Sequence, residues 1–331
     1  MKARGASGAD AKAGHEWSGM LIGVAVATSF AANSTLARLA YDAGSNALSV
    51  LTVRTGVALL ALFVLVLARR VPLAMAPRRR LGALLLGILL GVYSYGLLGG
   101  IEHMPVGLVV ITFYTYPFLV ALGSWLLGRE RITFATVVAL VVAFIGLTLA
   151  LDFTRAEVNT IGVSMALGAA FVFALVLLSS DRVRGDGDSR PVTLHMLLAA
   201  FVGYLAACAI SGHFALPREP YGWIGFVGTP VFYSFSIITL FVVITMIGPV
   251  RAALTLNVEP VASVILGYVV LDQHLGPVSI LGIAMVVGAV VSMRLASLHA
   301  RGAGGGRALA LAMILTGSLL ILGSLALYVL R

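Results

Sequence analysis

The sequence predicts an all-α polytopic membrane protein, a ten-helix bundle built as an inverted 5+5 repeat, with an extra C-terminal helix. The first observation is composition: 60% of the 331 residues are hydrophobic and 11% are charged, and the mean hydropathy is +1.06. The second is that apolar runs of about 18 residues or more recur along the chain, each long enough to cross the bilayer core. The third is that the pattern of the first half returns at a constant offset of 143 residues.

The spans fall into two units of five. Residues 1–17 are polar and mildly basic, which predicts a disordered cytoplasmic tail. The first repeat covers 18–152 and the second 158–297. A Gly-rich linker, 298–307, leads to an apolar run in 308–331 that has no counterpart in the repeat and predicts an accessory transmembrane helix. The ten expected spans are 18–41, 46–68, 81–101, 105–127, 132–151, 159–180, 192–212, 223–246, 249–271 and 276–296.

The repeat carries the prediction about topology. The offset aligns Tyr116 with Glu259 and Pro117 with Pro260, in the fourth and ninth spans. Five spans per unit is an odd number, so the second unit must enter the membrane with the opposite orientation. Inverted repeats of this kind are typical of secondary transporters.

The basic residues predict the orientation. The net charge of +9 does not indicate nucleic-acid binding, because the basic residues lie in short loops between apolar runs. Seventeen of the 22 lysines and arginines fall in loops that a cytoplasmic N-terminus places inside, against three outside. The positive-inside rule therefore predicts a multi-pass protein of the cytoplasmic (inner) membrane with a cytoplasmic N-terminus.

Two segments, 100–133 and 244–276, carry a resemblance to a known family. Each has a proline midway along a span and polar or charged residues just after it. They resemble the EamA-type permeases of the drug/metabolite transporter superfamily, as do the glycines of the fifth and tenth spans, Gly146 and Gly288, and Arg54 in the second. The resemblance implies a substrate cavity between the halves, alternating access, and transport, often export, of small metabolites. The eleventh apolar run departs from the family pattern.

Glu259 is the first candidate for a functional residue. It lies about ten residues into its span, hence about 15 Å deep, and Tyr116 reaches a similar depth from the other side. A carboxylate inside the membrane is a functional candidate because burying its charge is costly. We hypothesise that Glu259 carries a coupled proton or binds a cationic group of the substrate. The alternative is a fixed ion pair with an arginine.

Helical spacing extends this candidate site. Thr255 lies four residues before Glu259, and Thr112 lies four residues before Tyr116, so each pair shares a helix face. Tyr114, two residues from both Thr112 and Tyr116, is expected to point elsewhere. The prolines at 117 and 260 are expected to kink their spans and are candidate hinges; static kinks for packing are the alternative.

Further polar residues lie at mid-depth in other spans. Asn33, Tyr93 and Ser236 are candidate substrate contacts, and the last two correspond in the repeat. Hydrogen bonds between helices are the alternative for each of them.

Arg54 has several interpretations. We favour an ion pair with Glu102 or Glu259, because ionisable residues in membranes usually pair internally. The alternatives are a side chain that reaches the outer interface and a site for a substrate carboxylate.

Several chemistries are excluded or unsupported. The only lysines are Lys2 and Lys12 in the tail, so no Walker A motif exists. The single cysteine, Cys208, excludes an intrachain disulfide, and no residue spacing suggests a metal site or a cofactor. We therefore expect no enzyme activity.

The predicted function is secondary active transport, most simply export of a small metabolite by alternating access, with proton coupling through Glu259. A passive facilitator or exchanger of the same fold, a lipid-modifying membrane enzyme and an accessory subunit are the alternatives. The expected partners are a small-molecule substrate and the lipid bilayer, with no nucleic acid. The substrate stays open, and so does the oligomeric state, a homodimer included.

Overall fold

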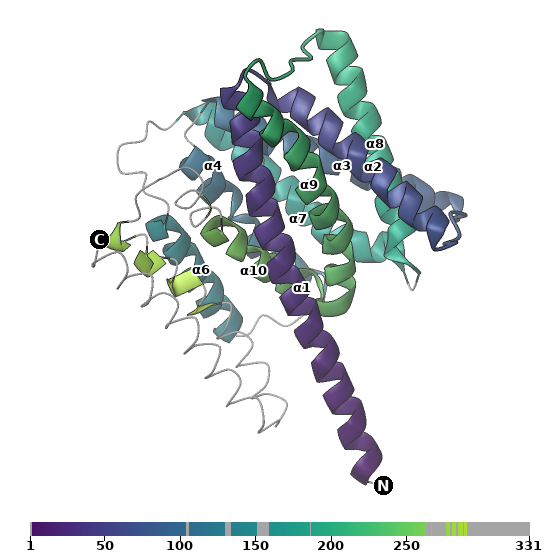
Figure 1. The fold of residues 1–331 in the computed structure, drawn as a ribbon. Coiled ribbons are helices and arrows are strands. Elements are labelled where there is room, and N and C mark those ends of the chain that lie inside the picture. The colour runs from purple at the N-terminus through teal and green to yellow at the C-terminus, as the bar shows by residue number, and fades with distance from the viewer. Residues whose placement is uncertain are drawn as a thin grey trace.

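The chain folds into a bundle of helices. The computed structural model describes residues 2–103, 106–129, 134–150, 159–185 and 187–262, with short stretches between 266 and 289. Every regular element in these residues is an α-helix (Figure 1). The helices are α1 (Lys2–Asp42), α2 (Ala47–Ala68), α3 (Pro77–His103), α4 (Val106–Phe113), α5 (Tyr116–Leu126), α6 (Phe134–Ala150), α7 (Thr160–Arg184), α8 (Ser189–Ser211), α9 (Pro220–Ile247) and α10 (Pro249–Leu256).

Length and composition identify membrane-crossing segments. Seven described helical segments are long and apolar enough to span a bilayer, and α6 contains a shorter apolar helix. Large apolar side chains face outward from the bundle, among them Ile210, which is 88% exposed. This surface is typical of helices that contact lipid, and the prediction of a helical multi-pass membrane protein is confirmed. The ninth and tenth predicted spans are described only in part, and residues 308–331 lie outside the described residues.

The N-terminal segment differs from its prediction. Helix α1 begins at Lys2, so residues 2–17 continue the first span as helix and project beyond the bundle (Figure 1). The expectation of a disordered tail was wrong. The segment is rich in alanine and contains no proline. A helix that the apolar span has already nucleated can therefore propagate through it.

Polar caps and glycines fix the ends of the other helices. The side chains of Asn46, Asn159 and Asp188 accept backbone N–H groups at the starts of α2, α7 and α8. Helices α7 and α8 end at Gly185 and Gly212, both with positive φ, a conformation that glycine adopts without strain.

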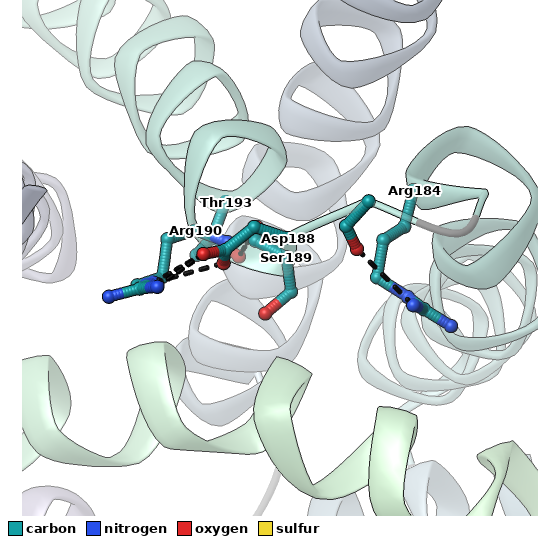
Figure 2. A network of polar contacts seen from close by, with 6 residues as sticks. Arg184, Asp188, Ser189, Arg190 and Thr193 are labelled. Carbon is teal, nitrogen blue, oxygen red and sulfur yellow. Dashed lines mark hydrogen bonds and ion pairs between the residues drawn. The ribbon is translucent and has the colours of Figure 1, made fainter. Parts of the chain in front are cut away.

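The short loop between α7 and α8 is held by ion pairs. Asp188 binds the guanidinium of Arg190, and Arg184 pairs with Asp181 at 3.5 Å. Figure 2 shows Arg190 turned toward Asp188 and Arg184 on the other side of the loop. Arg184 also donates to the carbonyl of Gly187.

The fourth span contains a helix break in the form of a short turn. Helix α4 ends at Phe113, Tyr114 and Thr115 form a turn, and α5 begins at Tyr116. Phe113 lies four residues before Pro117, and a proline ring clashes with the carbonyl of the residue four positions earlier. The proline therefore sets where the helix ends.

The ninth span has the same break. Helix α10 ends at Leu256, four residues before Pro260, and the turn falls at Asn257 before helix resumes at residue 258. The offset of 143 residues places Asn257 on Tyr114. The two interruptions thus occur at equivalent positions, as they would in a repeated unit.

The helices of the two halves interleave. Helix α1 packs along α9, and α3 packs along α7 and α8, while α2 also contacts α8 and α9. Helices α4 and α5 contact α7, and α10 contacts α1 and α5. The 143-residue offset exchanges the pair α1–α9 with α7–α3 and the pair α2–α9 with α8–α3. The core therefore forms mainly between the halves and not within each of them.

Glycines allow this close packing. A Cβ atom at Gly87 of α3 would lie 2.3 Å from the carbonyl oxygen of Met196 in α8, and one at Gly225 of α9 would lie 2.3 Å from that of Leu36 in α1. Only glycine fits at such contacts between backbones.

Candidate functional site

Glu259 and Tyr114 join the two helix breaks. The Tyr114 hydroxyl donates to Oε2 of Glu259 at 2.9 Å and lies 3.3 Å from the carbonyl oxygen of Leu256, the last residue of α10. Tyr114 is buried and Glu259 is partly buried. A side chain at the turn of the fourth span thus contacts a side chain near the turn of the ninth span, in the interior of the bundle.

The role of Tyr114 corrects the sequence analysis, which expected it to point away from this site. The expectation assumed a continuous helix through residues 112–116. Because the turn at Tyr114 and Thr115 tightens the hydrogen bonding to an i→i−3 bond at Thr115, the spacing rule for side chains on one face does not hold strictly there. The sequence signal that could have found Tyr114 is its position three residues before Pro117.

Tyr116 lies beside this pair. Its hydroxyl donates to the carbonyl oxygen of Ala253 in α10 at 3.4 Å, and its ring lies 5.5 Å from that of Tyr114, between ring centroids. Tyr116 is thus brought to the predicted interface, where it contacts the backbone of the other half.

The two threonines form local bonds. Thr255 donates to the carbonyl of Arg251 at 2.8 Å, and its methyl group would lie 2.8 Å from a Cβ atom at Gly23 of α1. Thr255 therefore packs against α1 in this structure, and its contact with a substrate stays a prediction. Thr112 is partly buried, and its carbonyl accepts a bond from Thr115 in the break.

An aromatic cluster surrounds the tyrosines. It consists of Tyr93, Phe113, Tyr114, Tyr116 and Phe173. The ring of Tyr93 lies 4.4 Å from that of Phe173, between centroids, and Phe113 lies 5.1 Å from Tyr116. The candidate Tyr93 therefore lies in the same buried layer as Tyr114. Phe113 and Phe173 carry no polar group, so nothing in the sequence separates them from ordinary core residues.

Arg54 of α2 lies at the other side of this layer. Its side chain is buried, with a relative exposure of 6%. Nη1 donates to Oδ1 of Asn33 at 3.3 Å and Nη2 to Oγ of Ser94 at 3.4 Å. The guanidinium carbon lies 4.2 Å from the ring centroid of Tyr233. Helices α1, α2, α3 and α9 thus all contribute to its surroundings.

The favoured ion pair of Arg54 with Glu259 is not formed. No N–O distance between these two described side chains lies within the 4.0 Å of an ion pair. The other predicted partner, Glu102, has a side chain outside the described part of the chain. Arg54 is instead held by neutral oxygens and an aromatic face.

Of the remaining predicted residues, some lie at the candidate site and others form contacts between helices. Asn33 contacts Arg54, as described above. Ser236 donates to the carbonyl of Val26 at 3.3 Å, which joins α9 to α1. Pro117 and Pro260 are both buried and follow the breaks.

Comparison with known sequences shows a family match over most of the chain. The sequence profile of the EamA-like transporter family matches residues 17–151 and, a second time, residues 160–295. The chain belongs to the EamA-like transporter family. The predicted resemblance is confirmed, and this EamA-like protein is a membrane transporter and not an enzyme.

The chain is also similar to individual proteins and to a solved structure. The threonine/homoserine exporter RhtA of Escherichia coli K12 is 29% identical over 225 residues, which are 66% of this chain and 72% of the relative. The protein of the same name from Salmonella typhimurium LT2 is 28% identical over 223 residues, with the same coverage. A solved crystal structure aligns with 86% of this EamA-like chain and 98% of its own, at 17% identity and a TM-score of 0.65. At that identity the likeness shows the fold alone.

Proposed function

We propose that this EamA-like transporter is a secondary active exporter of a small metabolite, that it works by alternating access, and that Glu259 carries the coupled proton. The observation that carries the proposal is the hydrogen bond from Tyr114 to Glu259, which joins the two broken spans. Interrupted helices at the interface of inverted repeats commonly form the substrate and ion sites of transporters.

The breaks support a moving interface. A break frees backbone groups and weakens the rigidity of a helix, so each half of a broken span can move separately. The two breaks are joined by side chains, Tyr114 with Glu259 and Tyr116 with the carbonyl of Ala253. Relative rocking of the halves would change these contacts first.

The proton is assigned to Glu259 on chemical grounds. An ionisable side chain in the membrane interior is costly unless it is paired, and Glu259 has a tyrosine as its described hydrogen-bonding partner, not a cation. A carboxyl group in this position can be neutralised by a proton or by a positively charged substrate. Alternation between the two states would couple export to proton entry.

The relatives suggest which substrates to test first. Two proteins that align with most of this chain are named as exporters of threonine and homoserine. Small amino acids are therefore the first candidates, and the names of these relatives make export the expected direction.

The test uses purified protein in liposomes with an acidic lumen and a neutral exterior, so that protons leaving the lumen drive the substrate in. We expect wild type to accumulate labelled threonine above its external concentration and Glu259→Gln to lose this accumulation. Glu219→Gln is the matched control, because Glu219 is exposed and makes no capping bond at the start of α9. Equal accumulation by wild type and Glu259→Gln would contradict the role of Glu259. Equilibration without accumulation in wild type would favour the facilitator.

A further inference from the structure

Arg54 has an unused hydrogen-bond donor in the interior of the bundle. Its Nε is buried and has no hydrogen-bond partner among the described residues. The two bonds that its Nη atoms make are long, at 3.3 and 3.4 Å, and both acceptors are neutral. An unpaired buried donor on a charged group is expensive. A carboxylate can accept from Nε and an Nη together, which is the strongest arrangement for a guanidinium.

Glu259 supplies the opposite charge in the same buried layer. Arg54 donates to Ser94 of α3, and Glu259 accepts from Tyr114, whose ring contacts Phe113 beside Tyr93 of α3. Arg54 and Glu259 are nevertheless not close enough to neutralise each other as an ion pair. The ion pairs formed by the described residues thus include neither Arg54 nor Glu259, and each could pair with a charged group of a substrate.

A series of contacts leads from the surroundings of Arg54 to Glu259. Ser94 contacts Arg54, and its neighbour in the sequence, Tyr93, stacks on Phe113 with 6.1 Å between the centroids. Phe113 meets the ring of Tyr114, which donates to Glu259. The aromatic rings and hydroxyl groups in this series come from α3, α4 and the turn after α4, and Glu259 comes from the second half.

We infer that Arg54 and Glu259 together bind a zwitterionic α-amino acid, with Arg54 holding its carboxylate and Glu259 its ammonium group. A purely cationic ligand would leave Arg54 unpaired, and a purely anionic ligand would leave Glu259 unpaired. A zwitterion neutralises both. This inference rests on the proposed function and adds a coupling step to it: the ammonium group and the proton compete for one carboxylate.

The test is a competition series on wild type under exchange conditions, with no pH gradient. Unlabelled L-threonine, its amide and its N-acetyl derivative compete against labelled L-threonine. The amide lacks the carboxylate, and the N-acetyl compound lacks the ammonium group. We expect each to compete at least about tenfold more weakly than threonine, which corresponds to about 1.4 kcal/mol.

Two variants assign each charge to its residue. Arg54→Gln should abolish the preference for threonine over its amide while keeping the preference over the N-acetyl compound. Glu259→Gln should do the reverse. Arg38→Gln is the control for the loss of an arginine, because Arg38 is half exposed and pairs with Asp42 at 2.9 Å. It should keep both preferences.

The outcomes separate this inference from the function on which it rests. If Arg54→Gln does not fold, the wild-type series still decides, since equal competition by all three compounds contradicts recognition of a zwitterion. Gradient-driven transport of a compound without these two charges would preserve the proposed function and overturn the inference. Absence of gradient-driven flux for any compound tested would overturn the function itself.

Discussion

Tyr114 and Tyr116 lie two positions apart and have different partners. The sequence alone placed Tyr116 at the interface between the halves and Tyr114 away from it. In the structure the Tyr114 hydroxyl donates to the carboxylate of Glu259, and the Tyr116 hydroxyl donates to a backbone carbonyl. The depth of Glu259 in the membrane stays a prediction, which rests on counting residues along a span. The identity of its partner could not be predicted, because it depends on the local backbone geometry at one turn.

Removal of the Tyr114 hydroxyl tests this contact. Tyr114→Phe keeps the ring in the aromatic cluster and deletes the donor to Glu259. A hydrogen bond to a charged group is worth about 1.5–3 kcal/mol, so we expect transport in the liposome assay to fall roughly tenfold and its pH profile to change.

Tyr95→Phe is the matched control for that variant. Tyr95 is 49% exposed on the outer face of α3, and its loss of a hydroxyl should leave both rate and pH profile unchanged. A normal pH profile in Tyr114→Phe would show that the hydrogen bond has no part in coupling.

The neighbours of Arg54 could not be predicted from the sequence either. Its depth in the second span indicates a buried cation, but its neighbours Asn33, Ser94 and Tyr233 come from three other helices. Their meeting depends on how each helix is rotated about its axis. Hydropathy indicates that rotation poorly here, because most of these helices are apolar on every side.

At the scale of elements, the prolines decide where two spans stop being helical. The sequence predicted that Pro117 and Pro260 disturb their spans, and a kink was the expected form. The structure shows one irregular turn in each span, directly after the residue four positions before the proline. Here the backbone groups released by the break find other partners, as the carbonyl of Leu256 does with Tyr114.

The loop between α7 and α8 gives a test at this scale. The hydrogen bond from the Arg190 guanidinium holds the pKa of Asp188 below its ordinary value. A depressed pKa stabilises the folded protein at neutral pH, and this contribution is lost as the pH falls through the folded-state pKa. Asp188 also caps α8 by accepting the N–H of Arg190.

Two substitutions separate the cap from the charge. Asp188→Asn retains a good cap and removes the ion pair, so it should lower stability at neutral pH by about 0–1 kcal/mol and reduce the loss of stability in acid. Asp188→Ala also removes the cap and should cost about 1 kcal/mol more. Thermal melting in detergent at neutral and acidic pH measures both. Equal melting temperatures for the two variants would show that the cap contributes nothing.

At the scale of the whole molecule, the sequence predicted the positions of the long helices because length and apolar composition suffice for that. It did not predict that α1 extends back to Lys2, since composition alone does not show whether a short polar segment continues an adjoining helix. The repeat predicts that each contact between helices has an equivalent contact in the other half. It does not predict which helices make contact. The particular pairs follow from side-chain shape, which glycine spacing indicates in part: Gly87 and Gly91 of α3 both face α8.

The interface between the halves can be tested at α9. Gly225→Ala would bring a Cβ atom to 2.3 Å from the backbone oxygen of Leu36, and overpacking of this kind costs about 1–3 kcal/mol. We expect a lower melting temperature. Gly203→Ala in α8 is the control, because a Cβ atom there has nothing within 4 Å, and alanine favours helix by up to about 1 kcal/mol. If both variants have the same melting temperature, the close contact of α1 with α9 at Gly225 does not contribute to stability.

The packing of α1 on α9 also bears on how the protein is made. The bond from Ser29 to Phe232 joins residues 203 positions apart, and that from Ser236 to Val26 joins residues 210 apart. During synthesis α1 leaves the ribosome long before α9 has been made. Until then, the face of α1 that later packs on α9 is exposed to lipid or covered by a chaperone. Docking of α1 is therefore a late event. A chain truncated before residue 220 would lack α9 and α10, the helices that α1 mainly contacts, although α3 could already pack on α7 and α8.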